Sequence, residues 1–179
     1  TTCTDVTLLE NTANLGNIPA SGSHVAENIF SILIHPSIPD QTVVPFDITV
    51  SDGNDQWVTT RNLTVNSPNL TISSTMIVDP NNNGFLEPGE NIAITVDVAN
   101  YGHMDAPGGT VNIVVNHPSV TLNISQFTLP PLSIGVVIPL SFTVSLGTDI
   151  PNGTLIPIGI AISAGIQNVN HNLMLAIGM

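Results

Sequence analysis

The sequence predicts an all-β protein, and three of its features carry this prediction. Helix-favouring Lys and Glu are rare, since Lys and Arg together number 1 and charged residues make up 8% of the 179 residues. Apolar β-branched residues alternate with small or polar ones, as at Ile92, Ile94, Val96 and Val98. Gly, Pro and Asn separate such stretches at short intervals, which is typical of strands joined by turns.

An internal repeat divides the chain into a partial and a complete module. The two copies share these matches: SIPDQTVVPFDITVSDG (37–53) with DIPNGTLIPIGIAISAG (149–165), Phe30 with Phe142, Val6-Thr7-Leu8 with Val120-Thr121-Leu122, Leu15 with Leu129, and Asn62-Leu63 with Asn172-Leu173. Residues 1–66 therefore correspond to the C-terminal part of a module that is complete over residues 69–179, with Ser67-Pro68 as the joint. Half a sandwich exposes strand edges and an apolar face, so we expect upstream chain, another subunit or packing on the second module to complete it.

The complete module is predicted to contain seven short strands, which indicates an immunoglobulin-like antiparallel β-sandwich. These strands cover Leu70–Val78, Asn91–Asn100, Thr110–Val115, Val120–Ile124, Val136–Ser145, Leu155–Ser163 and Asn170–Ile177. In the partial module, strands are expected near Val6–Leu9, Ala26–Ile34, Thr42–Val50 and Trp57–Asn66. The sequence Asp52-Gly53-Asn54-Asp55 predicts the hairpin turn between the last two.

The segment 79–90, DPNNNGFLEPGE, follows the spacing of a calcium-binding loop. Calcium is a hard cation that needs several converging oxygens, and a short loop can supply them from alternate positions. The predicted ligands are the side chains of Asp79, Asn81, Asn83 and Glu90 and the backbone carbonyl of Phe85. Gly84 permits the sharp turn between them. Strands flank this loop, so it is not an EF-hand, which needs a helix on each side.

Two further carboxylates are second candidates for the calcium site. Glu87 lies within the loop and is either a ligand or a solvated turn residue. Asp105 lies in the next polar loop, which the strands of a sandwich can bring close, or it only keeps that loop soluble. The alternative for the whole segment is a turn without metal, because Asn, Gly and Pro favour turns by themselves. That alternative leaves the gathering of carboxylates here unexplained.

Composition excludes several classes of function. The net charge is −12 with one cation, Arg61, so no basic patch for nucleic acid or anionic lipid can form. Prolines interrupt the uncharged stretch 106–148, which argues against membrane insertion. No nucleophile elbow, zinc-spaced pair or phosphate loop is present, and the histidines are scattered, so we expect no catalysis. The single cysteine, Cys3, cannot form an internal disulfide.

The strings MIVDPNNNGFLEPGENIAITVDVANYG (76–102) and DAPGGTVNIVV (105–115) resemble immunoglobulin-like repeat modules of large secreted and surface proteins, namely gingipain-type peptidases and adhesins exported by the type IX route. VTLLENTANLGNIPASGS (6–23) and LMLAIGM (173–179) are similar to the later part of such modules. The resemblance implies an extracellular or cell-surface location and a non-catalytic role as spacer, stalk or binding unit beside other domains of the same protein.

From these features we expect an extracellular, calcium-stabilised β-sandwich module of a larger protein, with spacing as its role and adhesion as an additional one. Two alternatives stay open. The chain can be a structural subunit of an extracellular fibre, because the partial module could accept a strand from a neighbouring subunit. It can also be a carbohydrate-binding module, in which Trp57 and Tyr101 would supply an aromatic platform.

Overall fold

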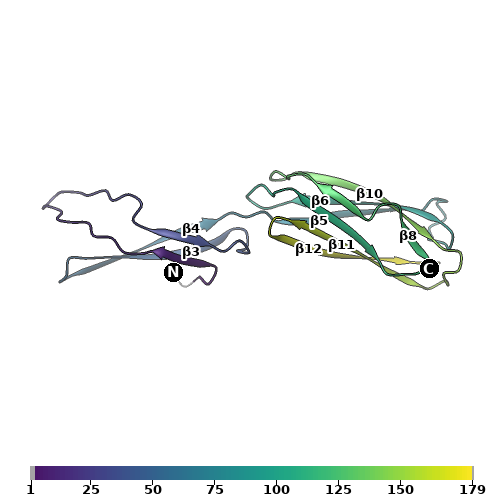
Figure 1. Ribbon diagram of the computed structural model, residues 1–179, viewed down its shortest axis with the longest axis horizontal. Coiled ribbons are helices and arrows are strands. Elements are labelled where there is room, and N and C mark those ends of the chain that lie inside the picture. The colour runs from purple at the N-terminus through teal and green to yellow at the C-terminus, as the bar shows by residue number, and fades with distance from the viewer. Residues whose placement is uncertain (1–2, 179) are drawn as a thin grey trace. The chain divides into compact units, whose positions relative to one another are not determined.

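The computed structural model describes residues 3–178 and divides the chain into two compact units, which we call unit 1 (Thr1–Val65) and unit 2 (Asn66–Met179). The division falls next to the predicted joint at Ser67-Pro68. The described residues form twelve antiparallel strands and no helix (Figure 1), as the sequence predicts. Residues 3–178 accordingly contain no helix long and apolar enough to cross a membrane.

Unit 2 is a β-sandwich of two four-stranded sheets. The first sheet has the order β5 (Leu70–Val78), β6 (Asn91–Asn100), β10 (Val137–Leu146) and β8 (Val120–Leu122). The second has the order β12 (Gln167–Ala176), β11 (Leu155–Ala164), β7 (Gly109–Val115) and β9 (Gln126–Leu129). Each strand in the middle of a sheet pairs on both edges, so its backbone polar groups are satisfied within the sheet.

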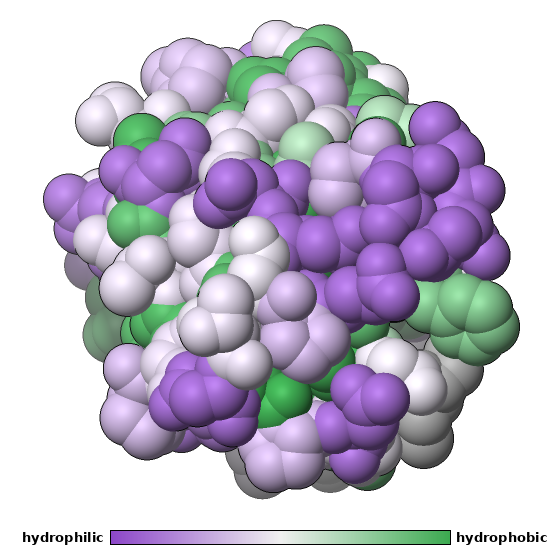
Figure 2. Space-filling model, turned by 90° about the vertical axis from the view of Figure 1, so that its right-hand side faces the viewer, coloured by the Kyte–Doolittle hydropathy of each residue, from purple (hydrophilic) through white to green (hydrophobic). Residues whose placement is uncertain are grey.

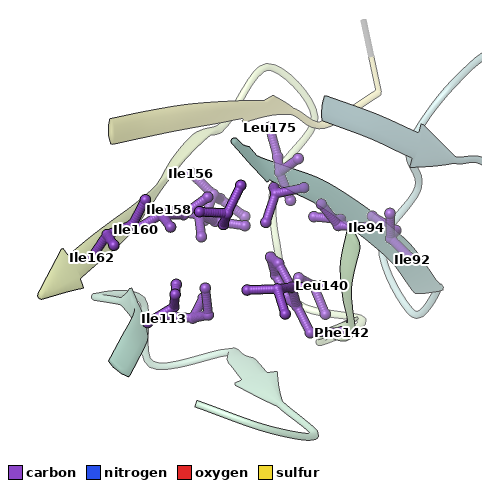
Figure 3. Packing of buried hydrophobic residues seen from close by; sticks show 14 of the residues in the cluster. Ile92, Ile94, Ile113, Leu140, Phe142, Ile156, Ile158, Ile160, Ile162 and Leu175 are labelled. Atoms are coloured by element: carbon purple, nitrogen blue, oxygen red, sulfur yellow. The ribbon is translucent and has the colours of Figure 1, made fainter. Parts of the chain in front are cut away.

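The core of unit 2 lies between these sheets and follows the period of two in the sequence. Alternate residues of β6 and β11 are buried, whereas their neighbours in sequence face outward. Figure 3 shows side chains from both sheets pointing toward one another, among them Ile158 of β11 and Phe142 of β10. Burial of such a side chain contributes roughly 1.5–3 kcal/mol. This cluster is therefore the main stabilising element of unit 2.

The predicted strands of unit 2 are present, and one further strand was missed. β9 (Gln126–Leu129) has four residues, and it lies between the predicted strands Val120–Ile124 and Val136–Ser145, where no strand was predicted. A strand this short carries one full alternation, Phe127 and Leu129 between polar residues, which is too weak a pattern to recognise. Conversely, the predicted strand Val120–Ile124 ends at Leu122.

Unit 1 consists of two separate two-stranded sheets. β1 (Val6–Glu10) pairs with β2 (Ser31–Ile34), and β3 (Thr42–Ser51) pairs with β4 (Gln56–Val65). The predicted hairpin turn joins β3 and β4. In it the Asp52 carboxylate accepts the backbone N–H groups of Asn54 and Asp55 at 2.9 and 2.8 Å. These two bonds hold the pKa of the Asp52 carboxyl below its ordinary value, that from Asp55 having the larger effect.

The strand registers of the two units follow the internal repeat. In unit 1, Val6 pairs with Ile34, and the matching residues Val120 and Leu146 pair in unit 2. The β3–β4 hairpin has the register of the β11–β12 hairpin when both strands keep the offset that relates 37–53 to 149–165: Val43 pairs with Thr64, and Leu155 pairs with Ala176. In this register Asn62-Leu63 corresponds to Met174-Leu175, so the predicted match with Asn172-Leu173 was wrong by two residues. The repeat is therefore a repeat of strand pairing as well as of sequence.

One strand of unit 1 is shorter than predicted. The sequence predicted a strand over 26–34, but β2 comprises Ser31–Ile34. The counterpart of this segment in unit 2 is β10, whose first part pairs with β6 and whose last residues pair with β8. Residues 3–65 contain a counterpart of β8, namely β1, but none of β6. Residues 26–30 lack that ladder partner, and a strand without a partner is not stable by itself.

Candidate metal centre

The loop between β5 and β6 is built on the Asp79 carboxylate. Asp79 Oδ1 accepts the backbone N–H of Asn81 at 3.1 Å, and Asp79 Oδ2 accepts that of Gly84 at 2.8 Å. The second bond closes the turn over five residues. Gly84 has a φ of +88°, a conformation that residues with a Cβ rarely adopt, so glycine is required at this position. The first and sixth positions of the loop are thereby tied together.

The two asparagines continue the same pattern along the loop. Asn81 Oδ1 accepts the N–H of Asn83 at 2.9 Å, and Asn83 Oδ1 accepts the N–H of Phe85 at 2.8 Å. Asp79, Asn81 and Asn83 thus each hold a backbone N–H with a side-chain oxygen. A carbonyl or carboxylate oxygen has more than one lone pair, so each of these oxygens can accept a further partner.

The two glutamates converge on one amide nitrogen. Asn81 Nδ2 lies 2.9 Å from Glu87 Oε2 and 2.7 Å from Glu90 Oε1. Asn83 Nδ2 donates to the same Glu87 oxygen at 3.0 Å, and Glu90 Oε2 accepts the Glu87 N–H at 2.8 Å. Two negative groups share a partially positive nitrogen here. Their side chains are half-buried, which strengthens both their repulsion and their need for a positive partner.

Backbone bonds fasten this loop to both sheets of unit 2. Gly89 N donates to Leu146 O at 3.1 Å, and Leu146 N donates to Glu90 O at 2.8 Å, which ties the loop to β10. On the other side, Gly178 N donates to Leu86 O at 2.7 Å next to a bridge between Leu86 and Ile177, just beyond β12. Figure 2 views unit 2 from the end at which the C-terminus lies, and hydrophilic side chains gather on this end.

The structure does not bring every predicted residue to the loop. Asp79, Asn81, Asn83, Glu87 and Glu90 are joined by the bonds above, and Phe85 contributes its backbone N–H while its side chain is exposed. Asp105 is not among them.

The expectation that Asp105 lies near the loop was wrong. Its carboxylate accepts the N–H of Ile134 at 3.1 Å and the hydroxyl of Ser133 at 3.5 Å. The loop 79–90 enters β6, whereas Asp105 follows its end. β6 has ten residues, so about 33 Å of extended strand separates these two ends. The turns before and after a strand lie at opposite ends of the sheet. Asp105 therefore lies at the end of β6 that is far from the loop 79–90.

The donor atoms of the loop fit a hard cation in kind, but the carboxylates are not gathered into a ready cluster. Within residues 3–178, no three His, Cys, Asp or Glu side chains stand close enough together to hold a metal ion. The reason is visible in the bonds: Asp79 faces Gly84 N, whereas Glu87 and Glu90 face the amide of Asn81. The oxygens are of the right type and spacing, and N–H donors bond those of Asp79, Asn81, Asn83 and Glu90 and one oxygen of Glu87.

One contributor to the site was missed by sequence reasoning. Leu86 packs against the core of unit 2 while its backbone carbonyl accepts the N–H of Gly178. The signal for this role was an aliphatic side chain in the middle of a loop of otherwise polar, Gly and Pro residues beside Phe85. Leu86 anchors the loop that carries the carboxylates.

Comparisons with known proteins place unit 2 in a family. Residues 69–173 match the model of a family described as "Domain of unknown function (DUF7932)". Among solved structures, the crystal structure of a FixG-related protein from Vibrio parahaemolyticus is similar, with 13% identity and a TM-score of 0.39. The similarity covers 59% of this chain and 96% of that one. No curated protein matches the chain.

Proposed function

Because the chain belongs to the family described as a domain of unknown function (DUF7932), we propose its function from the loop between β5 and β6. Unit 2 acts as a non-catalytic, calcium-stabilised β-sandwich module of a larger secreted or cell-surface protein. Its role is that of a spacer or stalk that can also contribute to adhesion. The location and the spacer role rest on the resemblance to modules of surface proteins, and the calcium dependence rests on the loop.

The observation that carries the proposal is that Glu87 and Glu90 share the amide of Asn81 in a loop whose Asp79, Asn81 and Asn83 follow calcium-loop spacing. The residues that would hold the ion are Asp79, Asn81, Asn83 and Glu90, with the Phe85 carbonyl and Glu87 as the remaining donors. A bound calcium ion would supply positive charge where Glu87 and Glu90 now share the amide of Asn81. It would thereby remove the repulsion between carboxylates that otherwise loosens the loop.

Stabilisation of this loop would reach the whole of unit 2. Its backbone bonds to Leu146 of β10 and to Gly178 beyond β12 attach the loop to both sheets. An ion that binds the folded loop alone adds about 2.7 kcal/mol when free calcium exceeds its dissociation constant about 100-fold. Calcium sites in extracellular modules bind at about 10⁻⁴–10⁻³ M, so a weak site suits a location outside the cell.

The surroundings of His35 are compatible with a non-catalytic role. His35 Nδ1 lies 2.7 Å from Ser37 Oγ, which is a base beside a hydroxyl. Both residues are exposed in one turn, however, and Ser37 N also donates to the same ring nitrogen at 3.3 Å. This is a local turn contact rather than a nucleophile placed in a cleft with a third orienting group.

The test is thermal unfolding of the full chain in calcium and in chelator, with a size-exclusion column run under both conditions. We expect a monomer whose unit 2 melts about 10 °C higher in saturating calcium. Asp79→Asn should abolish this gain because it removes the charge that starts the loop. Asp105→Asn is the matched control: it removes one carboxylate charge from the other end of β6 and should leave the gain unchanged.

Three results would count against the proposal. A parent protein that melts at the same temperature in calcium and chelator would reduce the loop to an ordinary turn. An equal calcium response in Asp79→Asn and Asp105→Asn would place the ion elsewhere. Large calcium-dependent assemblies on the column would favour the fibre in place of the spacer.

A further inference from the structure

Unit 1 contains an open groove of ≈ 990 Å³. One wall is residues 11–18, between β1 and β2. The other wall is residues 48–52 of β3 and the turn after it, together with Trp57 of β4. Ile29 and Phe30 line it as well. In Figure 1 the segment between β1 and β2 runs out beside the β3–β4 hairpin and back.

The internal repeat identifies what lies between the corresponding walls in unit 2. Residues 46–52 match 158–164 of β11, which pair with β7 residue by residue. Residues 12–15 match β9, which pairs with the other edge of β7. The walls of the groove are thus the counterparts of the two strands that flank β7. Residues 3–65 contain no strand that takes this place.

The burial of matched residues shows the effect of the vacant position. Ile162 of β11 is 1% exposed, whereas its counterpart Val50 is 41% exposed. Phe142, which pairs with β6, is 2% exposed, whereas its counterpart Phe30, which also lacks a counterpart of β6, is 48% exposed. The counterpart of β9 has lost its strand structure, since residues 11–18 form no ladder. Unit 1 therefore presents an unpaired strand edge beside apolar side chains that the same fold elsewhere keeps buried.

We propose that this groove is an acceptor site for one extended polypeptide strand from outside residues 1–179, which adds to β3 in the antiparallel direction and in the position of β7. Main-chain hydrogen bonds to the free edge of β3 give such a strand its affinity, and pockets for alternate side chains give it specificity. The strand carries two inward-facing β-branched residues that alternate with small or polar ones, as Val111 and Ile113 do in β7.

Three observations define this occupant further. The register of β7 on β11 places its Val111 opposite Ile162 and its Ile113 opposite Ile160, so the matching partners in unit 1 are Val50 and Ile48. The strand begins with glycine, because a Cβ at Gly109 would lie 1.9 Å from the carbonyl oxygen of Ser163. Asp52 is the one charged residue of the lining, so the strand carries no negative charge.

A second copy of the chain is not a suitable donor. Its own β7 is held on both edges, by β11 over seven residue pairs and by β9 over four. Release of that strand would unfold the core of unit 2, to which Val111 and Ile113 belong. The occupant is therefore a separate strand of the β7 type. The site does not depend on the calcium loop, which lies in unit 2.

The experiment titrates the full chain with a synthetic peptide of residues 107–116, PGGTVNIVVN, extended by a short uncharged Gly-Ser tail for solubility. Trp57 is the single tryptophan of the chain and lines the groove, so its emission reports binding directly. The control peptide carries Val111→Asn and Ile113→Asn with the same tail. Two variants of the full chain are compared: Val50→Lys inside the groove and Val43→Lys on the same strand outside it. Both residues are exposed in the parent.

We expect a saturable change in Trp57 emission with one peptide per chain and no change with the control peptide. Val50→Lys should weaken binding about tenfold or more, because it places a charge in the interface, whereas Val43→Lys should not. Hydrogen exchange on the parent chain provides a readout that needs no variant. The peptide should slow exchange of amides in residues 46–52 and leave the outer edge of β4 unchanged.

Other outcomes would overturn the proposal. These are equal binding of both peptides, equal affinity of Val50→Lys and Val43→Lys, or no slowing of exchange in residues 46–52 at millimolar peptide. A chain that dimerises without peptide and already protects these amides would show that a second copy fills the groove.

Discussion

Asn100 at the end of β6 allows the sharpest prediction about unit 2. Its side chain is fully buried and makes four hydrogen bonds. Its Oδ1 accepts the N–H groups of Asn69 and Gly102, each at 3.1 Å. Its Nδ2 donates to the carbonyls of Met104 at 2.9 Å and Leu132 at 3.1 Å. We predict that Asn100→Ala strongly destabilises unit 2, because it removes all four partners at once.

The size of the destabilisation depends on whether each former partner of the Asn100 side chain can find another hydrogen bond. The carbonyl of Leu132 keeps a bond from Ala106 N at 2.8 Å, so its loss is small. The N–H of Gly102 is buried and left without a partner, which costs about 1–3 kcal/mol. Asn69 and Met104 are exposed enough for water to replace the amide, so each loses about 0.5–1.5 kcal/mol. The expected total is about 2–6 kcal/mol, a large share of the roughly 5–15 kcal/mol typical of a domain.

Urea unfolding followed by two signals tests this prediction. Far-UV circular dichroism reports both units, whereas Trp57 fluorescence reports unit 1. With a slope of about 1–3 kcal/mol per molar urea, the dichroism midpoint of unit 2 should fall by about 2 M while the Trp57 midpoint stays. Asn170→Ala on the exposed side of β12 is the control. The argument would be refuted if Asn100→Ala lowered the free energy of unfolding of unit 2 by less than about 0.5 kcal/mol, or by no more than Asn170→Ala does. A buried N–H group without a partner should destabilise the unit by more than this.

Three further predictions test other parts of the fold. Phe142→Ala should destabilise unit 2 by about 3–5 kcal/mol in urea unfolding, because the ring is buried. The matched Phe30→Ala should destabilise unit 1 by less than about 1 kcal/mol, because that ring is half exposed. Equal losses would contradict the conclusion that Phe30 lies in an unfilled groove. Gly109→Ala should destabilise unit 2 by about 1–3 kcal/mol or more, because its Cβ meets the Ser163 backbone, and a neutral result in the same assay would show that β7 and β11 can separate. The Asp52 carboxyl has a lowered pKa in the folded hairpin, so its contribution is present above its ordinary pKa and is lost as pH falls through the lowered one. NMR titration of this carboxyl and the Trp57 midpoint between pH 6 and pH 3, with Asp52→Asn as control, would check that sign.

The sequence predicted those features of the candidate site that depend on residues close to one another in the chain. The bonds that shape the loop join residues two to nine positions apart, from Asp79 to Asn81 and from Asn81 to Glu90. Spacing in the sequence therefore predicts them. The position of Asp105 depends on the direction and length of β6, and the anchorage of Leu86 depends on where the chain returns after β12. Neither is visible in a window of twelve residues.

Alternation of apolar and polar residues was sufficient to predict the all-β class and the strands of the sandwich other than β9. The reason is that a strand buries every second side chain whatever its neighbours are. Which strands have neighbours was decided by the tertiary structure alone. Phe30 and Phe142 occupy matched positions in matched segments, yet one is half exposed and the other is buried, because burial requires a facing strand. Sequence thus sets which side of a strand is apolar, whereas the assembled sheets decide whether that side is covered.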